Sequence, residues 1–493
     1  VDLFRRRCYC CPLPRHVSPP CPSMHHTAAP RPVLHSWQAI FRLTWPQMLM
    51  MFAHFSVGFV DVWAAGQIAP TTQAALGLIT QSLFVLLIIC VGLSNGVVAA
   101  VSQSLGARRP LRAMRYGVYS LLAATAVGVL LMAIGLPGRD YFLTLLNTPD
   151  EVRPEAARLL VVYLATLPAN HLLVITNAIF RAYGEVRTPL WTVTVLALAN
   201  LLGDLVLGLG WGLGWLGGAG LGATGLGLAT LLSVSLGAGL NCWVLWQRGR
   251  LTWRAIPPRR WQRRARGYLL RVSWPAGASQ VVWQVGNLAL FVILGLLGNQ
   301  AMPAMAGYGA GQRLEAILFL PAMAFNMSAS VLVGQHLGAG DIAAARRAGL
   351  QLLALGCGGI SLAGLALWQV ASPVASWVAA DAIVHAEMLS YLFWNILAIC
   401  FTTGTMVLAG VMTGAGATLY TLGVLTVATW CVRLPLAYWL AVPFGWGAEG
   451  VWIAMFASQG VQCGALLILF LFRDWSRFAM RPVRRNHSQP AKR

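Results

Sequence analysis

Charged residues are scarce in this sequence, and acidic residues are the scarcest: of 493 residues, 14 are Asp or Glu and 35 are Lys or Arg. The charged fraction is 10%, whereas about 25% is usual for a soluble protein. Hydrophobic residues make up 58%, and apolar runs of about 20 residues, each long enough to cross a bilayer, recur along the chain. The sequence therefore predicts a polytopic all-α membrane protein, because a transmembrane barrel would show shorter segments of alternating polarity.

The sequence also lacks signatures of an enzyme or of an ATP-driven pump. It contains no P-loop, no H-E-x-x-H motif and no pair of C-x-x-C motifs, which argues against nucleotide or zinc chemistry. The connections on one side of the predicted helices are too short for a catalytic domain. We expect no enzymatic activity, no cofactor, and an energy source other than ATP bound by this chain.

The net charge of +21 does not indicate nucleic-acid binding, because the arginines lie between the apolar spans and in the tails. Basic residues follow the second, fourth, sixth, eighth and twelfth spans, and nine arginines lie between Arg248 and Arg271. Residues 64–73 and 209–220 contain none. Cytoplasmic loops of membrane proteins are enriched in Arg and Lys. This bias places the even-numbered connections and both termini in the cytoplasm of a bacterium, with the spans in its inner membrane.

Twelve spans are predicted, with Gly and Pro in most of the connections. They cover residues 40–64, 73–101, 113–136, 157–181, 189–210, 221–246, 270–297, 306–334, 345–370, 386–411, 417–441 and 449–472. An even number of spans agrees with two termini on the same side of the membrane.

The second half of the sequence repeats landmarks of the first half in the same order. Trp45-Pro46 recurs 229 residues later as Trp274-Pro275. Gln103-x-x-Gly106-Ala recurs 232 residues later as Gln335-x-x-Gly338-Ala, and the segment that begins at Ala182 recurs at the same offset from Gly414. Six spans per half is an even number, so both halves enter the membrane from one side. The repeat predicts two six-helix lobes related by a pseudo-twofold axis along the membrane normal, with a substrate path between them.

The repeat and the charge pattern define the expected domains. Residues 37–246 form the first lobe and residues 268–472 the second, joined by a basic cytoplasmic linker at 247–267. Residues 1–36 are expected to be a disordered tail, and residues 473–493 a basic cytoplasmic tail. Two interpretations of the first residues stay open: a metal-binding set, or a non-native extension, Val1 to Ser23, ahead of a start at Met24. The residues of that set are Cys8, Cys10, Cys11, Cys21, His16, His25 and His26.

Two acidic residues stand out because they lie inside apolar spans, where an isolated carboxylate costs at least a few kcal/mol. Asp61 lies near the end of the first span, and Asn200 and Asp204 lie four residues apart on one face of the fifth. The matching positions of the second half are Leu290, Val432 and Leu436. The shared fold therefore does not require these polar groups, which favours a role specific to the first half.

Two neighbouring carboxylates in a low dielectric resist being ionised together, so they can hold a proton, or they can bind Na⁺ through oxygen ligands. We predict that Asp61, Asn200 and Asp204 form such a cation or proton site, with Na⁺ as the one metal expected. Asn177 and Thr230 are candidates for further ligands. The alternatives are carboxylates neutralised by buried partners, and interhelical hydrogen bonds for Asn177 and Thr230.

Three further features point to conformational change and to substrate binding. Pro46 lies 15 residues before Asp61, about 22 Å along a helix, and predicts either a bend coupled to the charge state or a static kink. Gln280, Gln284 and Asn287 share one face of the seventh span, which predicts a substrate cavity or a helix contact. Arg313 and Glu315 are expected to start the eighth span as an interfacial ion pair.

Taken in order, these motifs resemble the multidrug and toxic compound extrusion (MATE) transporters over about residues 37–472. The resemblance implies two six-helix lobes in a V, antiport of organic cations against H⁺ or Na⁺, and a cation site at Asp61, Asn200 and Asp204. Asn177 and Thr230 match further polar positions of the family. Some branches carry an acidic residue on the seventh helix, where this sequence reads Val282-Trp283-Gln284. The matching segments are Trp45-Pro46, Val60-Asp61, Gly66, Gln103-x-x-Gly106-Ala, Phe180-Arg-Ala-Tyr-Gly184, Asn200-x-x-x-Asp204, Gly222-Ala-Thr-Gly225, Ala229-Thr230, Val333-Gly-Gln335-x-x-Gly338-Ala and Val432-Arg-Leu-Pro435.

The sequence thus predicts a secondary active multidrug exporter that works by alternating access as a monomer. Its expected partners are small cationic or amphipathic molecules and membrane lipid. One alternative is a flippase of lipid-linked oligosaccharide precursors in the same superfamily, which would need a cationic central cavity, whereas few arginines lie at mid-span. The other is a membrane-embedded enzyme with a cluster of acidic residues or histidines at one membrane face.

Overall fold

The computed structural model describes residues 37–211, 220–378 and 381–480. Twelve helices in this part of the chain are long and apolar enough to cross a membrane, which confirms the predicted number of spans. The described residues form helices, turns and loops, with no strand. The N-terminal tail at 1–36, with its cysteines and histidines, and residues 481–493 lie outside the described residues.

The first lobe contains six membrane-spanning helices and one short helix, α4 (Arg139–Leu145), in the third connection. The fifth spanning helix ends in a π-helical turn, η1. The spanning helices are α1 (Trp37–Ile68), α2 (Pro70–Gly106), α3 (Pro110–Gly135), α5 (Arg153–Ala182), α6 (Arg187–Gly203) with η1 (Asp204–Gly208), and α7 (Ala223–Gln247).

The second lobe repeats this arrangement, with a short helix α11 (Ala371–Val378) before its fourth spanning helix. A π-helical turn, η4, lies within its fifth. The spanning helices are α8 (Arg259–Gly295), α9 (Ala301–Ala339), α10 (Ile342–Gln369), α12 (Ala382–Ala415), the series α13 (Thr418–Val427), η4 (Ala428–Arg433) and α14 (Leu434–Ala441), and α15 (Gly447–Phe472).

Several helices extend beyond the apolar spans predicted for them. Helix α2 runs to Gly106 and α9 to Ala339, so both repeated Gln-x-x-Gly motifs are helical. Helix α8 begins at Arg259, inside the expected linker, and the expected C-terminal tail begins with a 3₁₀ turn, Trp475–Phe478, whose Trp475 is buried. Hydropathy locates the part of a helix that faces lipid, whereas hydrogen bonding decides where the helix ends.

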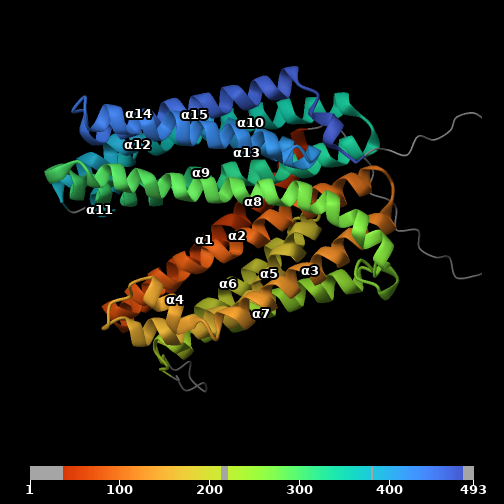
Figure 1. Ribbon diagram of the computed structural model, residues 1–493, viewed down its shortest axis with the longest axis horizontal. Helices are drawn as coiled ribbons and strands as arrows, with labels where there is room; N and C mark the ends of the chain where they lie inside the picture. Colours follow the sequence, from red (N-terminus) through yellow and green to blue (C-terminus); the bar gives the residue numbers. More distant parts are fainter. Residues whose placement is uncertain (1–36, 212–219, 379–380, 481–493) are drawn as a thin grey trace, which may run out of the picture.

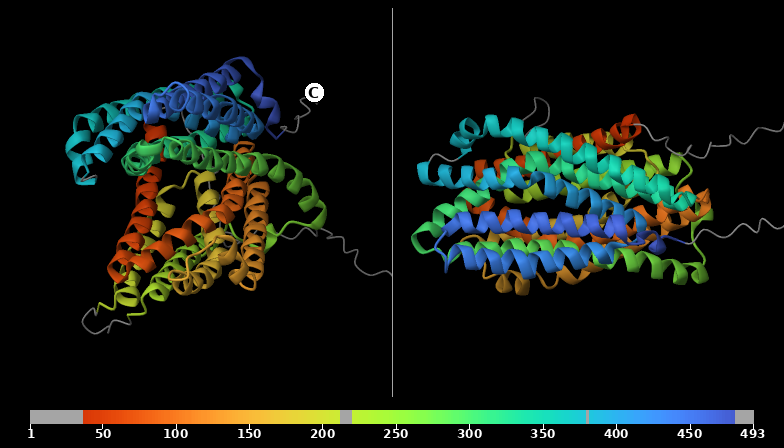
Figure 2. Two further views of the ribbon diagram at one scale, coloured as in Figure 1. Left: turned by 60° about the vertical axis from the view of Figure 1, so that its left-hand side comes forward. Right: turned by 90° about the horizontal axis from the view of Figure 1, so that it is seen from above.

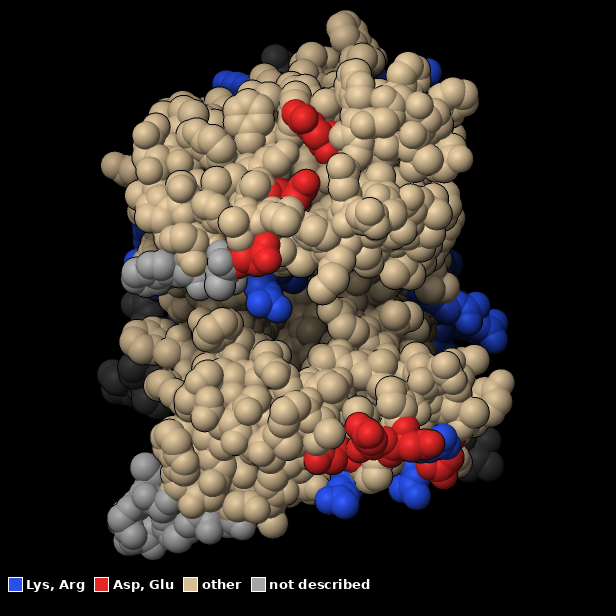
Figure 3. All heavy atoms as spheres, turned by 90° about the vertical axis from the view of Figure 1, so that its left-hand side faces the viewer, with Lys and Arg blue, Asp and Glu red and all other residues tan. Residues whose placement is uncertain are grey.

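The two lobes lie side by side and form a V (Figure 1; Figure 2). Helices α1 and α2 of the first lobe contact α8 and α9 of the second. The lobes meet towards the right-hand end of the molecule in Figure 1 and diverge towards the opposite end. Viewed from that opposite end, the surface is hollowed between the lobes (Figure 3). The expected two-lobe fold is confirmed.

Small residues allow the lobes to approach closely. A Cβ atom on Gly92 of α2 would lie 2.8 Å from the carbonyl oxygen of Ser273 in α8, and one on Gly96 would lie 2.3 Å from the Ser273 hydroxyl. Across the same interface, the side chains of Thr44 and Gln47 in α1 hydrogen-bond the hydroxyl of Ser328 in α9, at 2.9 and 3.0 Å. Small-residue packing and hydroxyl bonds of this kind hold membrane helices together, because lipid tails are as apolar as the helices and supply no hydrophobic driving force.

A variant of Gly225 tests the packing of α7 within the first lobe. In Gly225→Ala the added methyl group would lie 2.1 Å from the carbonyl oxygen of Leu207, and overpacking costs about 1–3 kcal/mol. Gly239→Ala, on the same helix, is the matched control because nothing lies within 4 Å of the added atom. We expect a lower apparent melting temperature in detergent for Gly225→Ala alone. Equal melting temperatures for the two variants would contradict the close crossing.

Candidate ion and substrate sites

Four helices of the first lobe bring polar side chains together in its interior. Asp61 of α1 interacts with Asp204 and with Asn200, the latter two at the end of the fifth spanning helix. Tyr163 of α5 interacts with both carboxylates and with Thr230 of α7. Asn200 and Asp204 are 0% exposed and Asp61 is 7% exposed. We call these five residues the acidic cluster. Sequence spacing identified four of its members and missed Tyr163.

The acidic cluster contains two carboxylates and no basic group. Among the described residues, no Arg, Lys or His forms an ion pair with Asp61 or Asp204. One oxygen of Asp61, both of Asp204, both amide atoms of Asn200 and the hydroxyl of Tyr163 are buried without a hydrogen-bond partner in the described part of the protein. Burying an unpaired charge costs several kcal/mol. These oxygens therefore suit a proton or a hard cation, and the alternative of neutralising buried partners gains no support.

The backbone around Asp204 departs from a regular α-helix. Asp204 opens the π-helical turn η1. Such turns occur mostly as single turns inside α-helices, frequently at functional sites. Gly203 and Gly208 flank it against α7, where a Cβ atom would lie 2.7 Å from Ala229 Cβ and 2.6 Å from Leu226 Cδ2, respectively. Close contact with α7 thus fixes the turn that carries the carboxylate.

Asn177 does not join the acidic cluster. Its side-chain oxygen accepts a hydrogen bond from Asn241 at 2.8 Å, and Asn241 also donates to Thr176 at 3.0 Å. On α5, Asn177 lies 14 residues from Tyr163, about 21 Å along the helix. Thr230, by contrast, lies beside Tyr163, with its hydroxyl bonded to the carbonyl of Leu226 at 3.1 Å. The structure therefore favours an interhelical hydrogen bond for Asn177.

Pro46 lies inside α1, which continues unbroken from Trp37 to Ile68. Its neighbours Thr44 and Gln47 form the hydrogen bonds to Ser328 in the second lobe. Pro46 thus occupies the part of α1 that touches the opposite lobe, while Asp61 occupies the part within its own lobe. The coupling of a bend at Pro46 to the charge of Asp61 stays a prediction.

The second lobe contains a buried polar group of its own, centred on Glu315 of α9. The Glu315 carboxylate accepts a hydrogen bond from the hydroxyl of Tyr391 and interacts with Arg433 of η4. Arg433 is 2% exposed, and its Nε donates to the hydroxyl of Ser458 at 2.8 Å. The expected interfacial pair of Glu315 with Arg313 is wrong, because α9 begins at Ala301 and no such ion pair forms among the described residues.

The polar group around Glu315 was not predicted from the sequence, because the comparison of the two halves considered only the positions equivalent to those of the first-lobe site. Val432 and Leu436 align with Asn200 and Asp204, but the charged residue of this segment is Arg433, at the end of the π-helical turn η4. An acidic residue inside an apolar span was the signal that could have identified Glu315. Because the eighth span was predicted to begin at residue 306, Glu315 was expected close to the membrane surface.

A cavity of about 550 Å³ is lined mainly by α8 and α9 of the second lobe, and Gln81 of α2 is the contribution of the first lobe. Gln284 and Asn287 line it as predicted, whereas Gln280, one turn earlier, is not part of its wall. The rings of Trp283 and Phe319 stack in the wall with centroids 6.0 Å apart. The full lining is Gln81 of α2 together with Trp283, Gln284, Asn287, Leu288, Phe291, Gln312, Glu315, Ala316 and Phe319 of α8 and α9. Its one ionisable residue is Glu315, which interacts with Arg433, and the rest of the wall consists of amide and apolar side chains.

One catalytic spacing does occur in the chain, G-x-S-x-G at Gly92-Leu-Ser94-Asn-Gly96. These residues lie inside α2, and the Ser94 hydroxyl donates to the carbonyl of Val91 at 2.8 Å. The nucleophile elbow of hydrolases needs a sharp strand-to-helix turn. The two glycines instead form the close contact with α8 described above.

Two repeated lobes of six spanning helices, a cavity between them and a buried acidic cluster inside one of them define a secondary transporter of the membrane. Residues 46–206 and 275–439 each match the sequence profile of the MatE family, one match in each lobe. The chain belongs to this family, as its motifs suggested, and it is a transporter rather than an enzyme.

Relatives of the chain cover nearly its whole length. It is 26% identical over 453 residues to the probable multidrug resistance protein NorM of Thermotoga maritima, covering 90% of this chain and 93% of that protein. It is 26% identical over 445 residues to the multidrug resistance protein NorM of Burkholderia vietnamiensis, with 87% and 92% covered.

Solved structures share the fold. An outward-facing multidrug resistance MATE family transporter has a TM-score of 0.80 at 20% identity, covering 90% of this chain and 97% of that one. A point mutant of the Vibrio cholerae MATE transporter VcmN also has a TM-score of 0.80, at 21% identity, with 88% and 95% covered.

Variants of Tyr163 and Asn177 separate the acidic cluster from the neighbouring hydrogen-bond network. Tyr163→Phe should alter the dependence of thermal stability on Na⁺ and pH, because the hydroxyl lies beside both carboxylates. Asn177→Ala should lower stability under all conditions, since the unpaired amide of Asn241 costs about 1–3 kcal/mol. Unfolding in detergent over a series of Na⁺ concentrations and pH values measures both. Loss of the ion dependence in Asn177→Ala, at an unchanged baseline stability, would contradict this assignment.

Proposed function

We propose that the protein is a secondary active exporter of the bacterial inner membrane, which exchanges H⁺ or Na⁺ for organic cations or amphipathic drugs by alternating access. The observation that carries this proposal is the pair of buried carboxylates, Asp61 and Asp204, without a basic partner among the described residues. The printed names of the relatives, multidrug resistance proteins, agree with it.

Ion binding can drive the lobes only through a difference in affinity between two conformations. When Asp61 and Asp204 are both ionised and empty, they repel each other in a medium of low dielectric. A bound proton or Na⁺ removes the repulsion and allows α1 to close on the fifth spanning helix. Because α1 also contacts α9 of the second lobe through Thr44 and Gln47, a movement of α1 reaches the interface between the lobes.

The cargo would occupy the cavity between the lobes. Glu315 supplies a negative charge for a cationic group, and the stacked pair Trp283 and Phe319 supplies apolar and aromatic surface. A flippase would have to bind a pyrophosphate there. The lining contains no basic residue, and the nearby Arg433 already interacts with Glu315. The cavity therefore favours export of organic cations over the flippase alternative.

The orientation follows from the loop charges. With the even-numbered connections in the cytoplasm, the end at which the lobes meet faces inward and the open end of the V faces the periplasm (Figure 1). In this conformation, cargo would leave outward and ions would enter from outside to reach the acidic cluster.

Removing the charge of Asp204 tests the ion site. Asp204→Asn should abolish export of a fluorescent organic cation from proteoliposomes, because the pair can then no longer switch between a charged and a neutral state. The assay applies H⁺ and Na⁺ gradients separately, which also identifies the coupling ion. Asp140→Asn is the matched control, since Asp140 is an exposed carboxylate of the same lobe. Full export by Asp204→Asn at normal expression would refute the site.

Neutralising Glu315 tests the cargo site in the same assay. Glu315→Gln should raise the KM for a monovalent organic cation about tenfold, as expected for the loss of about 1.4 kcal/mol of charge interaction, while transport of a neutral amphipathic dye changes little. Glu449→Gln, an exposed acidic residue of the second lobe, serves as the control. An unchanged KM for the cation would place the cargo elsewhere.

A further inference from the structure

The repeated motif Gln-x-x-Gly-Ala plays no part in the ion or cargo sites described above. It ends α2 as Gln103 to Ala107 and ends α9 as Gln335 to Ala339. Both copies lie where the lobes meet, at the right-hand end of the molecule in Figure 1. Polar side chains buried between two moving bodies need an explanation, because their hydrogen bonds must be rearranged when the bodies separate.

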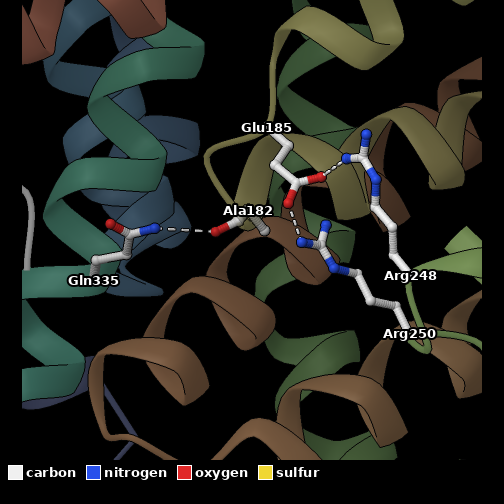
Figure 4. Close-up of polar contacts among 5 residues, drawn as sticks. All are labelled: Ala182, Glu185, Arg248, Arg250 and Gln335. Atoms are coloured by element: carbon white, nitrogen blue, oxygen red, sulfur yellow. Dashed lines mark hydrogen bonds and ion pairs between the residues drawn. The ribbon is translucent and has the colours of Figure 1, made fainter. Parts of the chain in front are cut away.

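Each glutamine of the motif donates a hydrogen bond across the lobe interface. Nε2 of Gln103, in the first lobe, donates to the carbonyl of Gly414 at the end of α12, at 2.7 Å. Nε2 of Gln335, in the second lobe, donates to the carbonyl of Ala182 at the end of α5, at 3.1 Å (Figure 4). Ala182 and Gly414 are separated by the same 232 residues as the two glutamines. The two hydrogen bonds are therefore equivalent contacts, related by the pseudo-twofold symmetry of the lobes.

The glycines of the motif permit the helices to cross at backbone contact. A Cβ atom on Gly106 would lie 1.9 Å from the carbonyl oxygen of Gln335, and one on Gly338 would lie 2.1 Å from the carbonyl oxygen of Gln103. No side chain larger than glycine fits at either position without separating the helices. The crossing holds each glutamine within reach of the opposite lobe.

The acceptor carbonyl of the first lobe is held by the segment that follows its sixth spanning helix. Arg248 and Arg250, just after α7, both pair with the Glu185 carboxylate, three residues from Ala182 (Figure 4). The Arg250 guanidinium also lies 4.0 Å from the ring centroid of Tyr183.

The second lobe uses its corresponding segment, residues 473–480 after α15, to hold the other half of the contact. The backbone N–H of Met480 donates to Oε1 of Gln103 at 2.8 Å, so that both ends of this amide are bonded. Arg477 donates to the hydroxyl of Tyr420, four residues beyond Gly416, at 2.9 Å. The basic segment after each lobe therefore fixes a partner of the cross-lobe bonds.

Packing alone does not close this end of the molecule. A cavity of about 370 Å³ lies beside Gln335, between Arg42 of α1 and residues 184–188 of the first lobe. On this side the lobes are joined by a side-chain hydrogen bond at the edge of open space. Gln335 thus borders open space, whereas its counterpart Gln103 is buried.

We propose that Gln103 and Gln335 form a twofold-related latch that keeps the lobes shut at the end where they meet, and that its release admits cargo from that side. The two residues are positioning residues for transport, since they touch neither ion nor cargo. The proposal rests on alternating access, as proposed above, but it concerns the positions of the lobes and not the identity of ion or drug.

Distances between spin labels test the latch directly. One labelled pair, Leu111 and Ile342, reports on the latched end, and a second pair, Leu145 and Met302, reports on the open end; all four side chains are exposed. Gln103→Met and Gln335→Met remove the bonds at nearly constant volume. Each should raise the population with a longer Leu111–Ile342 and a shorter Leu145–Met302 distance by roughly two- to tenfold, the effect of one net hydrogen bond.

Asn326→Leu is the matched control, because its side chain donates to the carbonyl of Met406 at 2.7 Å within the second lobe. A shift in the glutamine variants alone supports the latch. Unchanged populations in both, or the same shift in Asn326→Leu, would overturn it. Gln335 is half-buried, so Gln335→Met keeps the test available if Gln103→Met does not fold. The spin-label distances are measured without cargo. If the glutamine variants shift these distances but the protein exports no drug, the proposed function is refuted and the latch is still supported.

Discussion

Two carboxylates that face each other inside the first lobe, without a basic partner in the described chain, are the constraint on which the rest of this protein depends. Helices α1, α5, α6 and α7 pack so that Asp61 and Asp204 share one buried space. That arrangement is stable only when a proton or a cation compensates it. Under the proposed function, a bound ion would supply that compensation, and α1, which contacts the second lobe through Thr44 and Gln47, would extend its effect there.

The two lobes share one architecture but differ in their buried charges. Both interrupt the fifth spanning helix with a π-helical turn, and that turn carries Asp204 in the first lobe and Arg433 in the second. Arg433 can balance Glu315, whereas the described first lobe provides no such balance for Asp61 and Asp204. Under the proposed function, the first lobe would therefore bind an external cation, while Glu315 of the second lobe also lines the cavity between the lobes.

The interface between the lobes is symmetric, whereas the proposed ion and cargo sites differ between the two lobes. The crossing of α2 and α9 uses the same glycines, the same amide donors and equivalent carbonyl acceptors on both sides. An interface that opens and closes as two rigid bodies gains from symmetry, because both halves of the contact then break along the same direction. The ion and cargo sites gain from asymmetry, since each has to bind something different.

The sequence by itself determined the number of spans, the two lobes and the helix faces of Asp61, Asn200 and Asp204, because a bilayer dictates hydropathy, loop charge and the cost of a buried acid. Only the tertiary structure decided which polar groups meet. Tyr163 lies beside the two carboxylates, and Asn177 accepts a hydrogen bond from Asn241. Glu315 lies beside Tyr391 and Arg433. Spacing along one helix determines which side chains share a face of that helix. The side chains of other helices that they contact depend on how the helices are rotated against one another and on the π-helical turns. Neither of these produces a periodic pattern in the sequence.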